Sequence, residues 1–467
     1  MMFEVRIIQG SNERLLFAEE GARLSDVLTA NGISAEHPCG CLGLCRKCRA
    51  IVNGRSALTC RHIISEDITC ILPESAVSLV SDGELTDGNF FIALDIGTTT
   101  LVAALCNDSK RVLRTVTELN PQRLFGADVM SRISYCTSHG PEPLQKILID
   151  RMHEMIRVLV PEGHTVPEMI VSGNTAMLHL FLGIDCSAMG TAPYTPAFLD
   201  GRELSGAKIG LPEVDVIHTL PCMASFAGAD ITAGICSVGQ PEEGKYNLLV
   251  DLGTNAETAL WNGRKILCTS AAAGPCFEGG NISCGMRAGK GALSKVKEDG
   301  SVCVIGGVAA EGLCATGLID AIAVLRNRNI IDFSGYMGCS VFDLCPGVTL
   351  TQSDVRAFQE AKAAVCSAIK ILMLRAGIDA DDIGGFYVAG GFSEEMNIAS
   401  AARIGLFPKK LEKKFIPVNN SALTGTIRCR GKIYEAEEIA EKAQYIDLSA
   451  DVDFFDSYID CMELEPV

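Results

Sequence analysis

Apolar and polar residues follow two different patterns along the chain, and the point where the pattern changes suggests a domain boundary. Before residue 79, apolar residues recur at every second position in short runs, which predicts strands around one short helix. Residues 79–89 are polar and rich in turn-forming pairs, so we expect a domain of residues 1–78, a linker of residues 79–89 and a second part of residues 90–467. The elements expected in the first domain are strands at Phe3–Gln9 and Arg14–Glu19, a helix at Leu24–Asn31, and strands at Cys48–Val52 and Asp67–Leu72.

From residue 90 onward, short apolar strands alternate with segments of helical periodicity. Each expected strand ends in a turn rich in Gly, Thr, Asn or Ser. This alternation predicts the α/β fold class, as one domain or as two related lobes. The strands are expected at Phe91–Asp95, Met169–Ser172, Asn247–Asp251 and Gly385–Ala389, and the helices at Leu144–Val160, Leu318–Asn327 and Ser353–Ala376.

Composition narrows the class of protein. The chain has 467 residues, 48% of them hydrophobic, which is enough for two or three packed domains. Its net charge of -17 argues against nucleic acid and anionic membranes as partners, because both require basic surfaces. The start of the chain has no basic segment followed by an apolar run, and no long apolar stretch is free of acids, so we expect a cytoplasmic protein.

The chain contains 21 cysteines, and only one region concentrates them. Cys39, Cys45, Cys48 and Cys60 form a C-x5-C-x2-C-x11-C pattern. Three thiolates from one loop and a fourth from further along suit a [2Fe–2S] cluster, in which each iron takes two cysteines. The preceding hairpin–helix–loop order is typical of a β-grasp ferredoxin.

Several alternatives to this ligand set remain open. Cys41 is an alternative to Cys39, and Cys70 is a weaker alternative for the fourth position. Zinc sites usually combine two short pairs of cysteine or histidine, and only Cys45 and Cys48 form one here. A [4Fe–4S] cluster more often shows a C-x2-C-x2-C run, which this sequence lacks.

An apolar strand, an acid and a Gly/Thr turn occur in that order twice. Asp95 precedes the turn of Gly97, Thr98, Thr99 and Thr100, and Asp251 precedes the turn of Gly253, Thr254 and Asn255. Such turns present N–H groups and hydroxyls to phosphate, and each acid stands where a hydrated Mg²⁺ would lie. One such turn is often only a hairpin, but two in homologous positions are a much stronger signal.

A third segment completes the nucleotide-binding pattern. Gly390 and Gly391 follow a strand, where a nucleoside can lie against the bare backbone, and Glu257 is a candidate for orienting the attacking water. The set resembles the acetate kinase, sugar kinase, heat-shock chaperone and actin (ASKHA) superfamily, whose two actin-like lobes close over ATP and Mg²⁺. Walker-A, dinucleotide-binding and serine-hydrolase motifs are absent from the sequence.

Together these blocks resemble the ATP-dependent reductive activators of corrinoid proteins, often called RACo. The specific matches are Asn120–Gln122 with Gly126–Ile133, Ser172–Thr175, Gly228–Gly234, Ala271–Gly280, Thr316–Asp320 and Ala389–Phe392. The resemblance implies a [2Fe–2S] ferredoxin domain fused to an ASKHA ATPase domain, in which an electron from the cluster returns Co(II) of a corrinoid protein to Co(I). Members often carry an extra domain between the two parts, where this chain has only residues 79–89.

The resemblance also implies two partners, a corrinoid methyl-transfer protein and an upstream electron donor. A homodimer through the ATPase domain is a further possibility. We expect the glycine-rich segment Ser270–Arg287 to help form the corrinoid-facing surface, or else to be an ordinary surface loop. Three other functions compete with this one. They are an ATP-driven electron donor to another metalloenzyme, like the 2-hydroxyacyl-CoA dehydratase activators, an ASKHA small-molecule kinase, and a non-enzymatic chaperone or redox sensor.

Overall fold

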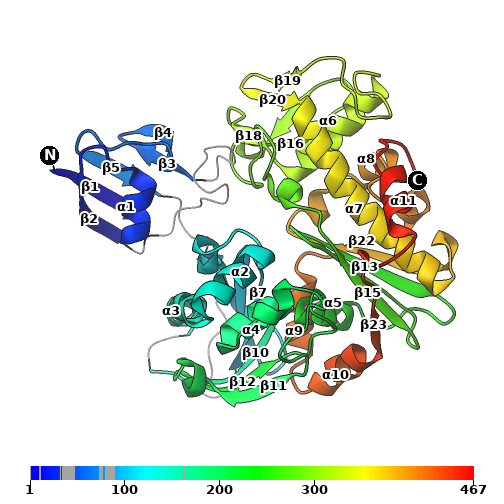
Figure 1. The fold of residues 1–467 in the computed structure, drawn as a ribbon, viewed down its shortest axis with the longest axis horizontal. Coiled ribbons are helices and arrows are strands. Elements are labelled where there is room, and N and C mark those ends of the chain that lie inside the picture. Colours follow the sequence, from blue (N-terminus) through cyan, green and yellow to red (C-terminus); the bar gives the residue numbers. More distant parts are fainter. Residues whose placement is uncertain are drawn as a thin grey trace. The chain divides into compact units, whose positions relative to one another are not determined.

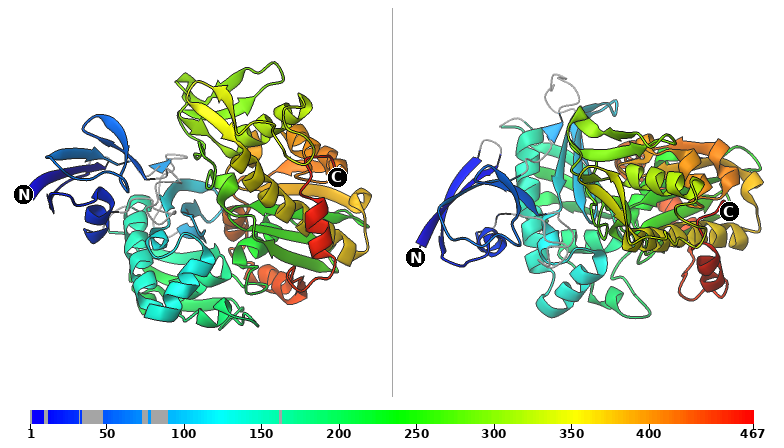
Figure 2. Two further views of the ribbon diagram at one scale, coloured as in Figure 1. Left: turned by 45° about the horizontal axis from the view of Figure 1, so that its top comes forward. Right: turned by 90° about the horizontal axis from the view of Figure 1, so that it is seen from above.

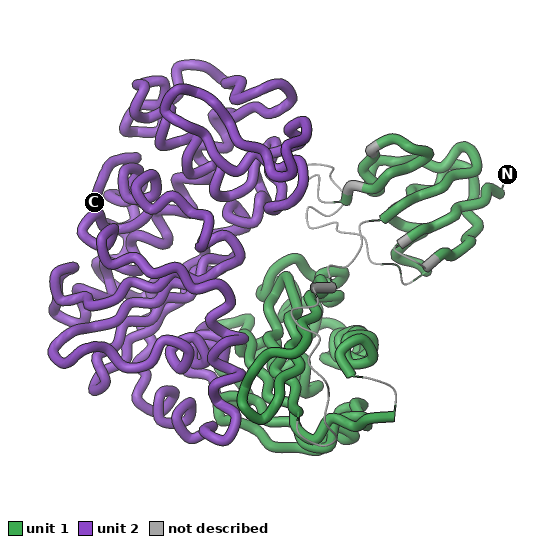
Figure 3. The backbone as a smooth tube through the Cα atoms, turned by 180° about the vertical axis from the view of Figure 1, so that it is seen from behind, with its two compact units in different colours: residues 1–220 green, residues 221–467 purple. Residues whose placement is uncertain are grey.

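The computed structural model describes residues 2–9, 12–31, 33, 48–72, 77–78, 90–160 and 163–467, drawn as a ribbon in Figure 1. By their internal packing the residues form two compact units, 1–220 and 221–467, which Figure 3 colours separately. Every sheet lies wholly inside one unit.

The N-terminal part of the first unit is a mixed five-stranded sheet in the order β2-β1-β5-β3-β4. Strand β1 pairs antiparallel with β2 and parallel with β5. Helix α1 begins at Leu24, and its Leu24 and Leu28 are fully buried against the sheet residues Val5 and Ile7. Figures 1 and 2 show this helix beside the blue strands, an arrangement expected of a β-grasp domain. The elements are β1 (Met2–Gln9), β2 (Asn12–Glu19), α1 (Leu24–Ala30), β3 (Arg49–Val52), β4 (Arg55–Leu58) and β5 (Ile68–Ile71).

The rest of the first unit contains a seven-stranded sheet in the order β11-β12-β10-β7-β8-β9-β6. Strands β7, β8 and β9 form an antiparallel meander, while β10 runs parallel to β7 and β12 parallel to β10. The strands are β6 (Val77–Ser78), β7 (Phe90–Ile96), β8 (Thr100–Asn107), β9 (Val112–Leu119), β10 (Val166–Gly173), β11 (Arg202–Ser205) and β12 (Val214–Thr219). The helices are η1 (Pro121–Leu124), α2 (Val129–His139), α3 (Glu142–Leu159), α4 (Thr175–Leu182), η2 (Ser187–Gly190) and η3 (Gly206–Ile209).

The second unit repeats this topology in a six-stranded sheet in the order β22-β21-β13-β14-β15-β23. Strands β13, β14 and β15 form a meander, and β21 runs parallel to β13. The strands of this sheet are β13 (Tyr246–Leu252), β14 (Ala256–Trp261), β15 (Ile266–Ala271), β21 (Ile383–Ala389), β22 (Phe415–Pro417) and β23 (Ala443–Tyr445). The α-helices are α5 (Ala229–Val238), α6 (Ala315–Asn327), α7 (Gln352–Ala376), α8 (Ile398–Arg403), α9 (Ser421–Arg428), α10 (Ile433–Lys442) and α11 (Phe454–Asp460). The remaining strands are β16 (Ala292–Val296), β17 (Val302–Val304), β18 (Gly312–Leu313), β19 (Val341–Cys345) and β20 (Val348–Thr351), and the short 3-10 helices are η4 (Pro275–Glu278), η5 (Ile305–Gly307), η6 (Ala380–Asp382), η7 (Ser393–Glu395) and η8 (Lys409–Lys414).

Alternate residues of β13 face the two sides of its sheet, as the pleat requires. Leu248 and Val250 belong to the core formed with α6 and α7, whereas Leu249 belongs to the core formed with α5. Asp251 therefore lies on the α5 side of the sheet. This placement matters for the chemistry of the second turn.

The α/β class and the duplicated lobe are confirmed, and each strand and helix expected from the periodicity is present with ends shifted by at most a few residues. Of the two large sheets, the sequence predicted the ranges of the parallel strands β7, β10, β13 and β21. Strands β8 and β14 are the second strands of the hairpins at the two acidic turns, and β9 and β15, for which no strand was predicted, complete the two meanders.

Candidate functional site

Two of the four predicted cluster ligands lie side by side in the β-grasp domain. The Sγ atoms of Cys48 and Cys60 are 3.1 Å apart, and both side chains are buried. The backbone N–H of Thr59 donates to the carbonyl of Cys48 at 2.9 Å, which ties the two segments together. Cys39, Cys45 and the alternative Cys41 lie outside the described residues. The two described thiols therefore converge as a pair of cluster ligands would, which is consistent with an iron–sulfur group.

Cys70, the alternative fourth ligand, is placed differently. It lies on β5, where Ile68 and Cys70 both point into the hydrophobic core of the domain, and its side chain is fully buried. Burial raises the pKa of the Cys70 thiol to about 11, so it is a neutral thiol at pH 7. Cys60 is buried as well, but its Sγ lies 3.1 Å from that of Cys48, whereas Cys70 packs among the core side chains of the sheet. This environment favours Cys60 over Cys70.

The first acidic turn connects β7 to β8. Asp95 stands one residue before the end of β7, and its cross-strand neighbours are Val102 on β8 and Ser172 on the parallel strand β10. A Cβ atom on Gly97 would lie 2.6 Å from the carbonyl oxygen of Thr100, so this position requires glycine. The residues Gly97, Thr98 and Thr99 form the turn, and Thr100 begins β8.

The second acidic turn connects β13 to β14 and has a different environment. Asp251 pairs directly with Glu257 across the two strands, so both carboxyl groups lie on the same face of the sheet. Asp230, in the first turn of α5, lies beside them on that face and contributes to the electrostatics of both. Next to the acids, Gly253 donates its N–H to the carbonyl of Asn255 at 3.1 Å, and the Thr254 hydroxyl donates to Glu278 Oε1 at 3.1 Å.

The three carboxyl groups disfavour one another's ionisation. Burial and then the charge of Asp230 raise the pKa of Asp251 to about 7. Burial raises the pKa of Asp230 to about 6. The pKa of Glu257 is raised well above its usual value by burial and by both aspartates. A site in which like charges are held together, partly buried, attracts a cation.

The chemistry of the donors suits a hydrated magnesium ion. Within the described ranges, no three His, Cys, Asp or Glu side chains are arranged to hold a metal ion by themselves. Carboxylates that bind Mg²⁺ through its water shell need no such cage, because Mg²⁺ usually keeps several waters in nucleotide sites.

Gly390 and Gly391 lie beside the second turn. Strand β21 pairs in parallel with β13 so that Ala389 stands opposite Asp251, and the two glycines follow immediately. Gly390 has φ +115, and a Cβ there would lie 2.8 Å from the carbonyl oxygen of Leu252. A Cβ on Gly391 would meet nothing within 4 Å, which leaves its backbone open to a ligand.

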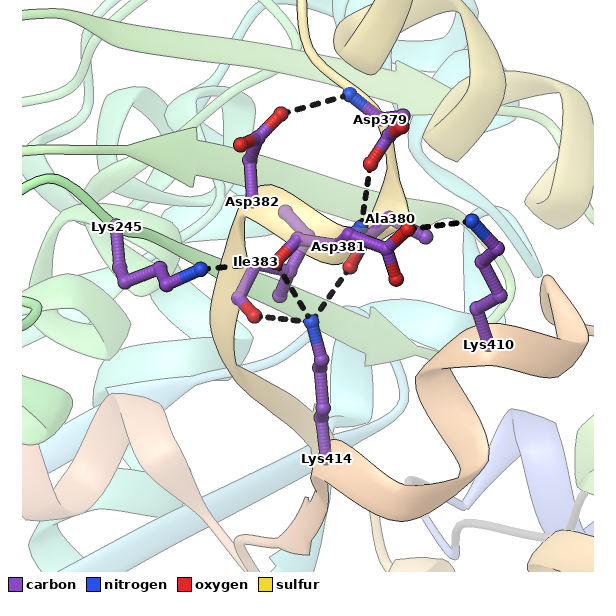
Figure 4. Close-up of polar contacts among 8 residues, drawn as sticks. All are labelled: Lys245, Asp379, Ala380, Asp381, Asp382, Ile383, Lys410 and Lys414. Atoms are coloured by element: carbon purple, nitrogen blue, oxygen red, sulfur yellow. Dashed lines mark hydrogen bonds and ion pairs between the residues drawn. The ribbon is translucent and has the colours of Figure 1, made fainter.

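Two lysines bind backbone carbonyls at the start of β21, as Figure 4 shows. Lys414 donates to the carbonyls of Ala380, Asp381 and Ile383 at 2.7, 3.1 and 2.5 Å. Lys245, just before β13, donates to the Asp381 carbonyl at 3.0 Å. The ammonium groups thereby satisfy the carbonyls before β21 and hold that strand in register with β13.

The segment Ser270–Arg287 is attached by hydrogen bonds to the second turn and to the start of α7. It includes η4, whose Cys276 and Phe277 are buried, and Glu278, which accepts the Thr254 hydrogen bond. The Ser283 N–H donates to Asp354 Oδ1 at 2.7 Å, at the start of α7. The segment is therefore built onto the second turn, which fits either of its expected roles.

Asp230 had no role predicted from the sequence, and neither did Asn120 and Arg132 beside the first turn. All three lie in sequence blocks that carried the family resemblance. An acid in the first turn of a helix was an available signal for Asp230. Its closeness to Asp251 and Glu257 depends on how α5 packs on the sheet and is not visible in the sequence.

The fold and the two turns define a two-lobed ATPase domain of the ASKHA type, preceded by a β-grasp domain. Comparison with known proteins makes the family specific. Residues 245–466 match the model of the C-terminal domain of RACo, the ASKHA domain, and residues 90–242 match the model of the RACo middle region. A middle region is thus present, inside the stretch assigned to the ATPase domain, and it carries the first turn.

Two relatives support the assignment. The corrinoid activation enzyme RamQ of Eubacterium limosum is 31% identical over 427 residues, covering 82% of this chain and 72% of that protein. The [Co(II) methylated amine-specific corrinoid protein] reductase of Methanosarcina barkeri is 26% identical over 393 residues, covering 75% of this chain and 72% of that protein. A solved structure described as a reductive activator for corrinoid, iron–sulfur protein has a TM-score of 0.73 at 25% identity and covers 99% of this chain and 98% of its own.

The chain therefore belongs to the RACo family of reductive activators of corrinoid proteins. No helix among the described residues is long and apolar enough to span a bilayer.

Proposed function

We propose that this protein is an ATP-dependent reductive activator that passes one electron from a [2Fe–2S] cluster to Co(II) of a corrinoid protein, giving Co(I). The observation that carries the proposal is the convergence of Cys48 and Cys60 in a β-grasp domain on the same chain as a RACo-type ASKHA domain. Cys39 and Cys45 would supply the other two thiolates. An upstream electron donor reloads the cluster.

ATP is needed because the electron moves uphill. A one-electron step that is unfavourable by about 200 mV costs about 4.6 kcal/mol, since about 59 mV corresponds to a tenfold change in the equilibrium constant. A ferredoxin alone would leave almost all of its acceptor oxidised. A nucleotide changes this balance only through a different affinity for two states of the protein, and closure of an ATPase domain can supply that difference.

Residues of both turns take part in handling the nucleotide. Gly97, Thr98, Thr99 and Thr100 offer N–H and hydroxyl groups to phosphate, as do Gly253, Thr254 and Asn255. Asp95 and Asp251 hold the water shell of Mg²⁺. Gly390 and Gly391 lie against the nucleoside. Glu257, with its raised pKa, is suited to take a proton from the attacking water.

The direct test is anaerobic mixing of the full chain with candidate corrinoid proteins, ATP, Mg²⁺ and a reductant, following the absorbance of Co(I). Co(I) should accumulate only when ATP is present. Electron transfer that went to completion without nucleotide would contradict the role given to ATP. Reduction of a 2-hydroxyacyl-CoA dehydratase, or phosphorylation of a small molecule, in place of Co(I) formation would favour the competing functions.

The ligand set has its own test. The purified protein should contain two irons and two sulfides per chain. Cys60→Ala should lose the cluster, as followed by iron content and visible absorbance. Cys70→Ala is the matched control, because it removes a core thiol of the same domain and should keep the cluster. The reverse result would show that Cys70 is the fourth ligand.

The segment Ser270–Arg287 is proposed to contribute to the surface that faces the corrinoid protein. Its link to Thr254 through Glu278 offers a route by which nucleotide at the second turn affects the partner. Coupling between two binding sites is reciprocal. If ATP increases the affinity of this chain for the corrinoid protein by some factor, then the corrinoid protein must increase its affinity for ATP by the same factor. ATP titrations with and without the partner measure this factor, and equal affinities would exclude binding coupling.

A further inference from the structure

The three consecutive carbonyl groups of the first turn all accept hydrogen bonds from two residues outside it. Asn120 Nδ2 donates to the carbonyl of Gly97 at 2.8 Å, and the Asn120 backbone N–H donates to the carbonyl of Thr99 at 3.0 Å. The Arg132 guanidinium donates to the carbonyl between them, that of Thr98. Both donor residues are fully buried.

This arrangement fixes the direction of the turn's N–H groups. In a trans peptide the carbonyl of one residue and the N–H of the next point in opposite directions. Because Asn120 and Arg132 hold the carbonyls of residues 97–99, the N–H groups of residues 98–100 are directed away from them. A row of N–H groups aimed to one side is the geometry that receives a phosphate.

The two donors are themselves held rigidly. Asn120 caps η1, where its Oδ1 accepts from the N–H of Gln122 at 3.0 Å. Arg132 lies in the first turn of α2, where its Nε donates to the carbonyl of Gly126 at 3.0 Å and its Nη1 contacts Met177 Sδ at 3.0 Å and Gln122 Oε1 at 3.5 Å. A Cβ on Gly126 would lie 2.7 Å from the Arg132 backbone nitrogen, so glycine is needed for this approach.

The guanidinium also brings charge. Its described acceptors are carbonyls, an amide and a thioether, with no carboxylate at ion-pair distance among the described residues. Burial lowers the pKa of Arg132 to about 9, with Asp128 raising it and Arg123 lowering it, so the side chain remains charged at pH 7. A buried cation without a neutralising acid is costly unless an anion approaches, and the neighbouring turn is where an anion would approach.

We propose that Asn120 and Arg132 are positioning residues for phosphate: they turn the N–H groups of residues 98–100 outward and place a buried positive charge behind them. This inference rests on the proposed binding of ATP, and it adds that the affinity for phosphate depends on residues that need not touch the nucleotide. It also gives the Asn120–Gln122 and Gly126–Ile133 blocks a physical role.

The test compares ligands that differ in phosphate number. Mg·ATP, Mg·ADP and adenosine are titrated calorimetrically into the full chain and its variants. Arg132→Gln should weaken Mg·ATP binding about tenfold or more, Mg·ADP binding by less, and adenosine binding by less than about twofold, because the outward N–H groups and the charge behind them act on the phosphates and not on the nucleoside. Arg132→Lys, which keeps the charge but loses the fork of donors, should be intermediate. Asn120→Ala should follow the same gradation with ligand.

Arg114→Gln is the matched control, because Arg114 lies on β9 of the same sheet and also donates to a backbone carbonyl, that of Leu159 at 3.1 Å, but pairs with Leu105 near the other end of β8. It should leave all three affinities unchanged. An equal loss for adenosine and ATP in Arg132→Gln, or no loss beyond the control, would overturn the inference. If Arg132→Gln does not fold, Arg132→Lys against Arg114→Lys decides in the same way. A wild-type chain that bound no nucleotide would instead refute the proposed function itself.

Discussion

The two acidic turns occupy the same place in two sheets of the same topology, yet their surroundings are opposite in charge. The first turn has a buried arginine behind it, and the cross-strand neighbour of Asp95 on β8 is Val102. The second has two further carboxyl groups around its acid, Glu257 on the next strand and Asp230 on α5. The two lobes share the hairpin and its acid, while the residues packed around each hairpin differ.

The difference suggests a division of labour. A turn with outward N–H groups and a cation behind it is suited to the phosphate oxygens. A turn surrounded by carboxyl groups with raised pKa values is suited to carry most of the interaction with the metal ion, which Asp95 is proposed to share, and to proton transfer from water. The glycines differ as well: a Cβ would lie 2.6 Å from a carbonyl oxygen at Gly97 but 3.3 Å at Gly253, so the first turn is the tighter of the two.

The largest expected effect is loss of ATP hydrolysis on removing either acid. Asp95→Ala and Asp251→Ala should each lower the rate by about a hundredfold or more, because each would release the hydrated ion beside the phosphates. Hydrolysis is measured as phosphate release, with iron content as a check that the β-grasp domain is intact. Asp215→Ala, an exposed acid on β12, should hydrolyse ATP normally. If one of the two variants kept the wild-type rate, its turn would not belong to the site.

A second comparison uses the glycines. Gly97→Ala should destabilise the chain by about 2–3 kcal/mol, because the methyl group meets the Thr100 carbonyl and the backbone must move. Gly253→Ala should cost about 1 kcal/mol or less, since its methyl group needs a shift of only a few tenths of an ångström. Thermal melting of both variants measures the difference. Equal melting temperatures would mean that the two turns tolerate an added methyl group equally well. The difference in packing between them would then not affect stability.

Many residues of the candidate site could be proposed from the sequence because they lie in local motifs. The contacts that could not be proposed depend on how distant elements pack. The acids, the turn glycines and the Gly390–Gly391 pair are local features of a strand end, so short-range patterns can propose them. Arg132 acts on Thr98 from 34 residues away, and that contact depends on how α2 packs. Spacing alone did not decide between Cys60 and Cys70. The alternation of Ile68 and Cys70 toward the core on β5 argues for Cys60 once the strand is seen.

The smallest expected effect is on stability and concerns the acids of the second turn. Asp230 has a folded-state pKa of about 6 against an ordinary value of 3.8. Between these two pH values the folded chain keeps a proton on Asp230 that the unfolded chain has lost. Its neutral form contributes stability that is fully present below pH 3.8 and lost as pH rises through about 6. Asp230→Asn should remove this loss. Without nucleotide or Mg²⁺, the variant should be more stable than the wild type at pH 8 by about 1–2 kcal/mol, which allows for screening of a partly exposed group.

At pH 4 the advantage of Asp230→Asn should largely disappear, because the aspartate is then mostly protonated in the folded chain. Denaturant melts of the full chain at the two pH values measure both differences. Saturating Mg²⁺ should shrink the advantage at pH 8, since a cation relieves the same repulsion. The matched first-turn variant, Asp95→Asn, removes an acid whose cross-strand neighbour on β8 is Val102, and no comparable gain is expected from it. A similar gain in stability in Asp95→Asn would mean that the acids of the two turns experience the same electrostatic repulsion. The proposed division between a phosphate-binding turn and a metal-binding turn would then have no basis.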